Sequence, residues 1–282
     1  MNDLTLQARG LPLHALDRGE GPLAVLLHGW LDHAHSFDLL AKLLPGRTVA
    51  LDQRGHGDSA WVGPGGFYHL AEYVADLDCV LEALSPDAPV RLVGHSMGAS
   101  VGLLYAAARP ARVAHLTLLD GAPLTITPQE VPARLSSYLE DLRKLERKRR
   151  RVDSLEDAIA RMLRFNPALT APVATLLATA GISPDPAQGG ALAWKWDPLL
   201  RAHSPLPFTE EAVQLLVAQV TAPVLAVRGE RGFLGDEAEL RARFPRLALE
   251  VHTLEAGHHL HLEAAGETAA LVTAAWSAIQ ID

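Results

Sequence analysis

Residues 90–99 read V-R-L-V-G-H-S-M-G-A, and this stretch decides how the rest of the chain is interpreted. Residues 90–93 form a short apolar run rich in β-branched side chains, which is typical of a strand buried in a parallel sheet. A G-x-S-x-G pattern follows at residues 94–98, and residues 99–109 have the small side chains of a closely packed helix. Strand, G-x-S-x-G and helix in this order predict a strained turn that lifts Ser96 above the sheet as a nucleophile. Taken alone, the five residues also fit an ordinary strand-to-helix turn.

Composition sets the broad class of the protein. The 282 residues are 49% apolar, enough for one large domain or two modest ones. The net charge of -8 argues against a nucleic-acid surface and gives no reason to expect an anionic membrane as partner. The single cysteine, Cys79, cannot form an internal disulfide, which is compatible with a reducing compartment. The first ten residues lack the pattern of a signal peptide, and no apolar run is long enough to cross a bilayer, so we expect a cytoplasmic protein.

Strand and helix patterns alternate along most of the chain. Residues 4–8 and 13–16 predict an antiparallel edge hairpin. The further strands are predicted at 23–27, 48–51, 90–93, 113–119, 224–228 and 248–254, and the helices between and after them at 38–44, 68–84, 99–109, 209–220, 236–244 and 267–279. This alternation predicts an α/β fold, with a mostly parallel central sheet and helices on both of its faces.

The alternation is interrupted after the strand that ends at Asp120. Residues 123–208 contain no convincing sheet strand; helices are predicted at 133–151, 154–165 and 172–180, followed by an irregular stretch with Gly189 and Gly190. We interpret 123–208 as a helical cap inserted over the carboxyl edge of the sheet. Residues 1–122 and 209–282 then form the core.

Three parts of the sequence together resemble the α/β-hydrolase fold enzymes over nearly the whole chain. They are H-G-W at 28–30 behind an early strand, the turn around Ser96, and G-H at 257–258 behind the last strand. The chain order of serine, acid and histidine is the order of that fold. Longer strings look most like serine-hydrolase-like proteins: H-G-W-L-D-H-A-H-S-F-D, A-L-D-Q-R-G-H-G-D-S and W-K-W-D-P-L-L-R.

The resemblance implies a role for each part. A serine hydroxyl is a weak nucleophile at neutral pH, so Ser96 requires a base, and the first histidine of G-H-x-x-H-L-E, His258, is the one such enzymes use. The backbone N–H groups of Met97 and Trp30 fit the two oxyanion donors, each worth about 3 kcal/mol in acyl transfer. His259 and His261 are expected to pack in their loop. No further ligand cluster with metal spacing accompanies them, so we expect no metal and no cofactor.

The acid of the triad departs from the common pattern. It usually stands three residues after the glycine of the loop that follows the penultimate strand, and counting from Gly229 gives Gly232, which has no side chain. A minority of the fold places the acid after the strand that follows the nucleophile helix, and Asp120 stands there. An aspartate at a strand end can also simply cap a turn. Because the residue at the common position is a glycine, Asp120 is preferred as the acid, with Glu230 and Asp236 as alternatives.

Other residues are weaker candidates for the substrate pocket. They are Asp32, His33, His95, Trp194 and Trp196, and each can equally be a packing residue. The basic run 143–151 is interleaved with acidic side chains, so we expect it to be a solvated helix face.

The predicted function is a serine hydrolase of the carboxylic ester hydrolase type, cleaving an ester or thioester through an acyl-enzyme. Two alternatives stay open: a cofactor-independent oxygenase on the same fold, and a non-catalytic ligand-binding protein. Dehalogenase or epoxide-hydrolase chemistry is disfavoured, because both would require an aspartate in place of Ser96. The expected partner is a small-molecule acyl substrate, and the sequence does not decide between a monomer and a homodimer.

Overall fold

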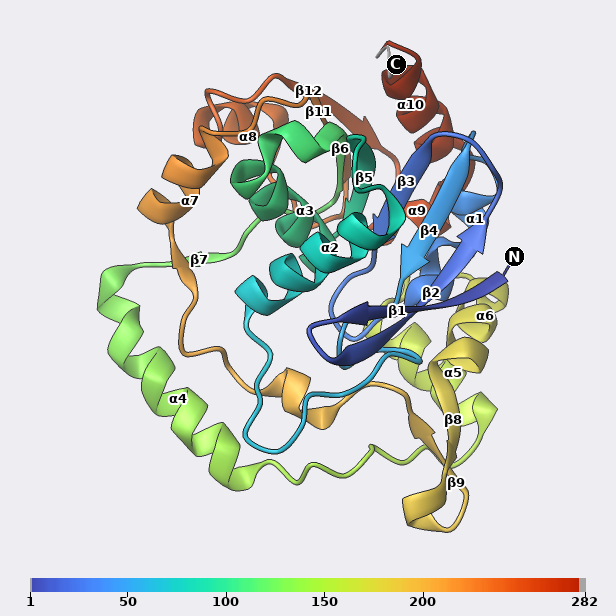
Figure 1. The fold of residues 1–282 in the computed structure, drawn as a ribbon. Helices are drawn as coiled ribbons and strands as arrows, with labels where there is room; N and C mark the ends of the chain where they lie inside the picture. The colour runs from blue at the N-terminus through green and yellow to red at the C-terminus, as the bar shows by residue number, and fades with distance from the viewer. Residues whose placement is uncertain (1, 279–282) are drawn as a thin grey trace.

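A computed structural model of the chain describes residues 2–278, and its centre is an eight-stranded sheet (Figure 1). The strand order is β1-β2-β4-β3-β5-β6-β11-β12. Only the pairs β1–β2 and β2–β4 are antiparallel; the other five pairs in this sheet are parallel, which confirms the predicted fold class. The strands are β1 (Asn2–Ala8), β2 (Leu11–Arg18), β3 (Leu23–Leu27), β4 (Arg47–Leu51), β5 (Val90–His95), β6 (Val113–Leu119), β11 (Val224–Gly229) and β12 (Leu249–Leu254).

Helices cover both faces of this sheet and create two apolar cores. One face carries α2 (Leu70–Leu84), α3 (Met97–Ala108), α7 (Glu210–Val217) and α8 (Glu237–Arg243), and the other carries α1 (Asp38–Ala41), α9 (Leu260–Glu263) and α10 (Ala265–Ser277). Successive strand residues point to opposite faces, so Leu92 belongs to the first core and Val93 to the second. This burial on both faces explains why the central strands read as continuous apolar runs.

Residues 123–208, all within the described part of the chain, add no strand to the eight-stranded sheet. They form α4 (Val131–Lys144), α5 (Leu155–Phe165), α6 (Ala171–Gly181) and the hairpin of β8 (Ile182–Asp185) and β9 (Ala191–Trp194). The two ends of the segment meet, because β7 (Thr125–Ile126) pairs with β10 (Phe208–Thr209). Whether the segment acts as a cap stays a prediction.

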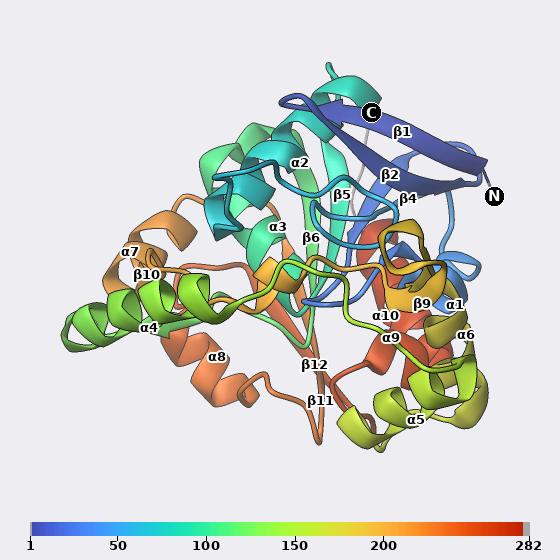
Figure 2. The same cartoon turned by 90° about the horizontal axis from the view of Figure 1, so that it is seen from below.

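The segment has two arms on opposite sides of the carboxyl edge of the sheet (Figure 2). One arm is α4, and the other, made of α5 and α6, lies against α1 and α9. No residue of α4 is buried, and the leucines at 135, 139 and 142 are between 42% and 48% exposed. In the α5–α6 arm, Leu177 packs with Leu262 of α9 in a small core. None of the described helices has both the length and the apolarity required to cross a membrane.

The local structure differs from the sequence prediction at three places. The helix predicted at 38–44 is a single turn, α1, which follows a 3-10 turn at 34–37. The helix predicted at 133–151 ends at Lys144, since the backbone of Leu145 is extended, and Arg147 and Arg149 bind groups elsewhere in the fold. The stretch after α6, expected to be irregular, forms the β8–β9 hairpin, since Gly189 and Gly190 adopt positive φ angles of 68° and 83° at its turn. The predicted end of the last helix, Ile279, lies outside the described residues.

Candidate active site

Ser96 lies on a strained turn between β5 and α3. Its φ of 51° and ψ of -112° are unusual for a residue with a side chain, and such a conformation costs about 1–3 kcal/mol. Close packing of the backbone holds the turn: a Cβ on Gly98 would lie 2.0 Å from the carbonyl oxygen of Leu27. The Ser96 N–H also donates to the carbonyl of Leu119 on β6, at 3.0 Å. The turn therefore presents the Ser96 hydroxyl at the carboxyl end of the sheet, as the motif predicts.

Asp120 follows β6, and its buried carboxylate binds His258. Nδ1 of His258 donates to Oδ2 of Asp120 at 2.6 Å. The same carboxylate accepts backbone N–H groups from Phe233 at 2.8 Å, Gly229 at 3.2 Å and Leu234 at 3.3 Å. Four donors surround one carboxylate, so its position and its negative charge are stabilised by hydrogen bonds from two loops of the core.

The absence of a side chain at residue 232 has a direct steric reason. A Cβ built on Gly232 would lie 2.2 Å from Oδ1 of Asp120. The Asp120 carboxylate therefore fills the space that a side chain at residue 232 would need. The two alternative acids lie elsewhere, since Glu230 is exposed and Asp236 caps α8 by accepting the Glu239 N–H at 2.9 Å.

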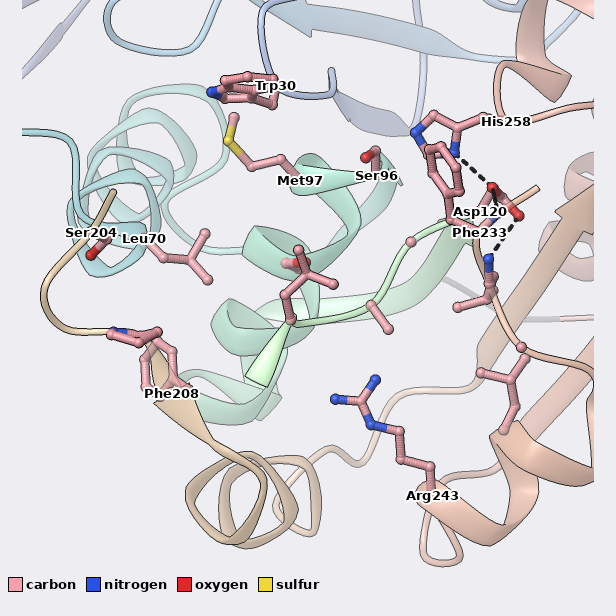
Figure 3. A pocket seen from close by; sticks show the side chains of 18 of the residues that line it. Trp30, Leu70, Ser96, Met97, Asp120, Ser204, Phe208, Phe233, Arg243 and His258 are labelled. Atoms are coloured by element: carbon pink, nitrogen blue, oxygen red, sulfur yellow. Dashed lines mark hydrogen bonds and ion pairs between the residues drawn. The ribbon is translucent and has the colours of Figure 1, made fainter. Parts of the chain in front are cut away.

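Ser96 and His258 line one cavity of about 730 Å³ (Figure 3). Because Nδ1 of His258 donates to Asp120, its Nε2 carries the lone pair that can accept a proton. Trp30 and Met97 line the same cavity, and within residues 2–278 neither of their backbone N–H groups has a hydrogen-bond acceptor. Other walls are largely apolar: Leu70, Ala122, Leu124, Leu206, Pro207, Phe208, Phe233, Leu234 and Leu240.

Buried histidines shape the loop that carries Trp30. Nε2 of His28 accepts the Gln53 N–H at 3.0 Å, and Nε2 of His56 accepts the Leu31 N–H at 3.1 Å. Burial lowers the pKa of both imidazoles, that of His56 to about 3, so both rings are neutral and able to accept these hydrogen bonds. Neither histidine was predicted to have a role, although both stand in the strings that carry the family resemblance.

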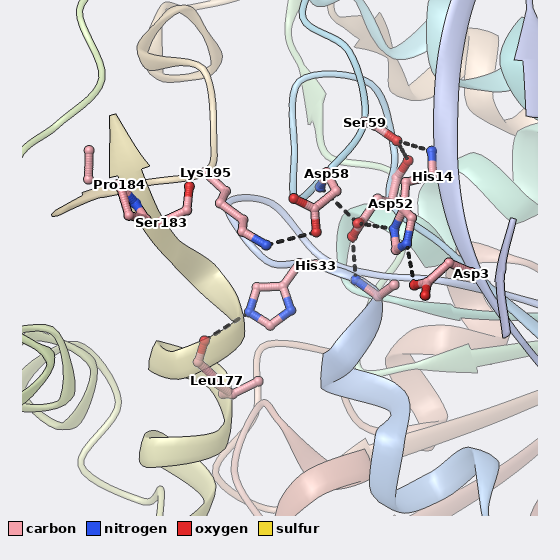
Figure 4. A network of polar contacts seen from close by, with 12 residues as sticks. Asp3, His14, His33, Asp52, Asp58, Ser59, Leu177, Ser183, Pro184 and Lys195 are labelled. Carbon is pink, nitrogen blue, oxygen red and sulfur yellow. Dashed lines mark hydrogen bonds and ion pairs between the residues drawn. The ribbon is translucent and has the colours of Figure 1, made fainter. Parts of the chain in front are cut away.

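Asp52 connects this loop to the edge of the sheet (Figure 4). Its carboxylate accepts the N–H of Ala34 at 2.6 Å, the N–H of Asp58 at 2.9 Å and Nδ1 of His14 at 2.8 Å. The hydrogen bond to Asp52 raises the pKa of His14 to about 9. Lys195 of the inserted segment pairs with Asp58 at 2.7 Å, so the same network also reaches across to residues 123–208.

The five weaker pocket candidates divide into two groups. Asp32, Trp194 and Trp196 line a second cavity of about 690 Å³, which borders the first at Trp30. His33 and His95 line neither cavity. His33 is buried, with Nε2 donating to the carbonyl of Leu177 at 3.0 Å, and His95 lies behind Ser96, with Nε2 donating to the carbonyl of His258 at 3.0 Å.

Three polar side chains, of which the two histidines are buried, form a cluster close to Ser96. One ligand atom each from Asp32, His95 and His261 lies within 4.8 Å of the others. Oδ2 of Asp32, Nδ1 of His95 and both ring nitrogens of His261 have no hydrogen-bond partner among residues 2–278. A carboxylate and two imidazoles suit either a divalent cation or a bridging water molecule. The cluster adjoins the candidate catalytic residues, since the ring centroids of His95 and His258 are 4.6 Å apart, and the predicted absence of a metal stays a prediction.

Two kinds of comparison place the chain among known proteins. A sequence profile of the alpha/beta hydrolase fold matches residues 22–265. The structure is similar to a hypothetical protein from Pseudomonas aeruginosa PAO1, with 36% identity, a TM-score of 0.88, and coverage of 99% of this chain and 100% of that one. It is also similar to the thioesterase domain from the curacin biosynthetic pathway, with 26% identity, a TM-score of 0.85, and coverage of 97% and 99%.

Two sequence relatives carry serine hydrolase names. Human serine hydrolase-like protein 2 is 35% identical over 170 residues, which are 57% of this chain and 54% of the relative. A probable serine hydrolase from Drosophila melanogaster is 29% identical over 255 residues, 84% of this chain and 76% of the relative. The matches to the human relatives span little more than half of their length.

Proposed function

Because the chain belongs to the α/β hydrolase fold family, we propose that it is a serine hydrolase that cleaves acyl esters or thioesters. In this proposal Ser96 is the nucleophile, His258 the base and Asp120 the acid. The observation that carries it is the 2.6 Å contact of His258 with Asp120, next to Ser96 in the same cavity. The serine hydrolase relatives and the thioesterase neighbour support this reaction class.

The proposed reaction begins when Oγ of Ser96 attacks the substrate carbonyl and His258 Nε2 takes the hydroxyl proton. The backbone N–H groups of Met97 and Trp30 bind the oxyanion that develops on the carbonyl. His258 then gives its proton to the leaving alcohol or thiol, and an acyl group remains on Ser96. A water molecule, activated by His258, releases the acid and regenerates the serine.

The first cavity favours an apolar acyl group. Its walls consist mainly of aliphatic and aromatic side chains, and its one arginine, Arg243, is paired with Glu210 at 2.9 Å. Burial of each methylene group contributes about 0.8 kcal/mol, so binding should strengthen as the acyl chain lengthens. We further propose a small-molecule substrate and a cytoplasmic location, in keeping with the acidic composition.

Labelling with a fluorophosphonate, followed by intact-mass measurement, tests the proposal. We expect one adduct on the wild type, none on Ser96→Ala, and slower labelling of Asp120→Asn. The matched control is Ser136→Ala, an exposed serine on α4 that should label like the wild type. A folded wild type that forms no adduct would contradict the proposal. Oxygen uptake that survives labelling of Ser96 would favour the oxygenase, and ligand binding without turnover would favour a binding protein.

A further inference from the structure

The second cavity differs from the first in its charge. Four arginines line it, at positions 150, 161, 164 and 201, together with the aspartates at 32 and 157. Arginines thus outnumber aspartates there by two, although the whole chain carries a net charge of -8. A concave site with an excess of one charge attracts ligands of the opposite charge.

Most of this positive charge is not balanced by the protein. Arg161 is neutralised by Asp157, with contacts of 3.0 and 2.7 Å. The side chains of Arg150, Arg164 and Arg201 make no hydrogen bond or ion pair with any residue in the range 2–278. The run 143–151 is mostly exposed, as the sequence predicts, but the helix ends at Lys144, and Arg150 lies at the wall of a cavity.

The charged cavity adjoins the proposed catalytic groups. Trp30 lines both cavities, and its indole N–H donates to the carbonyl of Leu200 at 2.9 Å, which fixes it between them. His258 lines the first cavity, and the next residue, His259, lines the second. A leaving group must lie near His258 to receive its proton, and Trp30 is the residue at which the two cavities meet.

We propose that the second cavity binds the phosphate-bearing leaving group of a thioester or ester whose acyl chain occupies the first cavity. This inference rests on the proposed function. A guanidinium group can donate two parallel hydrogen bonds to two oxygens of one phosphate. Three separate parts of the chain supply the arginines: Arg150 follows α4, Arg164 belongs to α5, and Arg201 ends the 3-10 turn at 198–201. Three arginines around a cavity of about 690 Å³ suit a group with more than one phosphate better than a single carboxylate.

In the thioester case, the bond between the Ser96 oxygen and the acyl carbon forms as the carbon–sulfur bond breaks. The sulfur takes the proton that His258 removed from Ser96, so the first product is a phosphate-bearing thiol. Water then cleaves the acyl-enzyme and releases the acid. The arginines bind the thiol portion throughout and take no part in proton transfer.

A matched pair of thioesters tests the inference. Butyryl-coenzyme A carries phosphates on its thiol portion, and S-butyryl-N-acetylcysteamine has the same reacting group without them. We expect the wild-type kcat/KM to be at least about tenfold higher for the coenzyme A thioester, because charge-assisted hydrogen bonds from the arginines bind its phosphates. The triple variant Arg150→Gln/Arg164→Gln/Arg201→Gln should lose this preference and keep its kcat/KM for the neutral thioester within about twofold.

The control variant is Arg246→Gln, an exposed arginine that lines neither cavity and should leave both rates unchanged. Equal wild-type kcat/KM values for the two thioesters, or an equal loss on both in the triple variant, would overturn the inference and leave the proposed function intact. If the triple variant instead lost a kcat/KM preference for thioesters with a negative charge on the acyl portion, the assignment of the second cavity to the leaving group would be overturned.

A binding measurement separates this inference from the catalytic proposal. Calorimetry with free coenzyme A needs no turnover and can use Ser96→Ala. We expect binding that weakens with added salt and is at least about tenfold weaker in the triple variant, whereas pantetheine, which lacks phosphate, should bind both proteins equally. Failure of the wild type to bind coenzyme A at millimolar concentration would overturn the inference. If the wild type bound coenzyme A but cleaved neither thioester, the proposed function would be contradicted and the inference about binding would stand.

Discussion

The loops at the carboxyl ends of the strands and the inserted segment 123–208 border the same two cavities, but they are built differently. The strand-end loops carry Ser96 and Asp120 at positive φ angles of 51° and 44°, fixed by buried hydrogen bonds. The helix α4 of the segment has no buried residue. A rigid frame can hold reacting groups within a fraction of an ångström, whereas a lightly packed segment can vary with the substrate. Changes in the loops should therefore alter the rate of chemistry, and changes in the segment should alter stability and substrate preference.

The largest effect is expected for Ser96→Ala. Removal of the nucleophile should lower kcat for a p-nitrophenyl acyl ester by about 10⁴-fold or more, because no other group can form the acyl-enzyme. Steady-state kinetics beside Ser136→Ala, from the segment, measures the difference. If the two serine variants had similar activities, the expectation that the strand-end loops, and not the segment, set the rate of chemistry would be wrong.

Asp120→Asn should have the next largest effect. Asparagine keeps the shape of the side chain, but it removes the negative charge that stabilises protonated His258 and disturbs the tautomer of the ring. We expect kcat to fall by about 10³-fold with the fold intact, as measured by kinetics and by circular dichroism. Asp236→Asn is the matched control, because that side chain caps α8 away from His258. A similar loss of activity in both variants would contradict the assignment of the acid.

Gly232→Ala tests whether a side chain at residue 232 and the Asp120 carboxylate compete for the same space. The new Cβ would lie 2.2 Å from the Asp120 carboxylate, so we expect the carboxylate to shift and kcat to fall by about 10- to 100-fold. In an Asp120→Gly background the same substitution should have almost no further effect, because the obstructing atoms are gone. A double-mutant cycle measures this coupling, and additive effects would show that the two positions do not compete for space.

Arg147→Met should affect stability more than chemistry. Asp197 is completely buried, and its carboxylate binds the Arg147 guanidinium at 2.6 Å and the Tyr68 hydroxyl at 2.8 Å. Removal of the arginine leaves a buried carboxylate without its counter-ion, which should lower the free energy of unfolding by about 3 kcal/mol. Urea denaturation measures the loss. Arg143→Met, at an exposed position of the same segment, should change stability by less than about 0.5 kcal/mol.

The smallest effect is a pH dependence at the edge of the sheet. The hydrogen bond to Asp52 raises the pKa of His14 from 6.5 to about 9, so the folded state holds its proton more tightly than the unfolded state. Its contribution to stability is complete below pH 6.5 and is lost as the pH rises from 6.5 to about 9. We expect this contribution to be about 1 kcal/mol after solvent screening. Urea titrations at several pH values should show the slope in the wild type and a flatter profile in His14→Gln.

Much of the site could be predicted because the signals are local. The turn around Ser96 requires glycines at 94 and 98, and these stand within two residues of it. Asp120 was predicted from its place after β6 and from the lack of a side chain at 232, whereas the steric conflict between the two positions became visible only in space. The roles of His56 and Asp52 were missed because each binds backbone groups in another loop, which no local pattern reveals.

The order of strands and helices, and the choice of Ser96 as the candidate nucleophile, could be read from the sequence alone. These features depend on side-chain periodicity and on steric limits within a few residues. Only the tertiary structure decided which carboxylate meets His258 and which arginines remain without partners around the second cavity. The physical reason is that those contacts join residues far apart in the chain. Their distances are set by the register of the sheet and by how residues 123–208 pack against it.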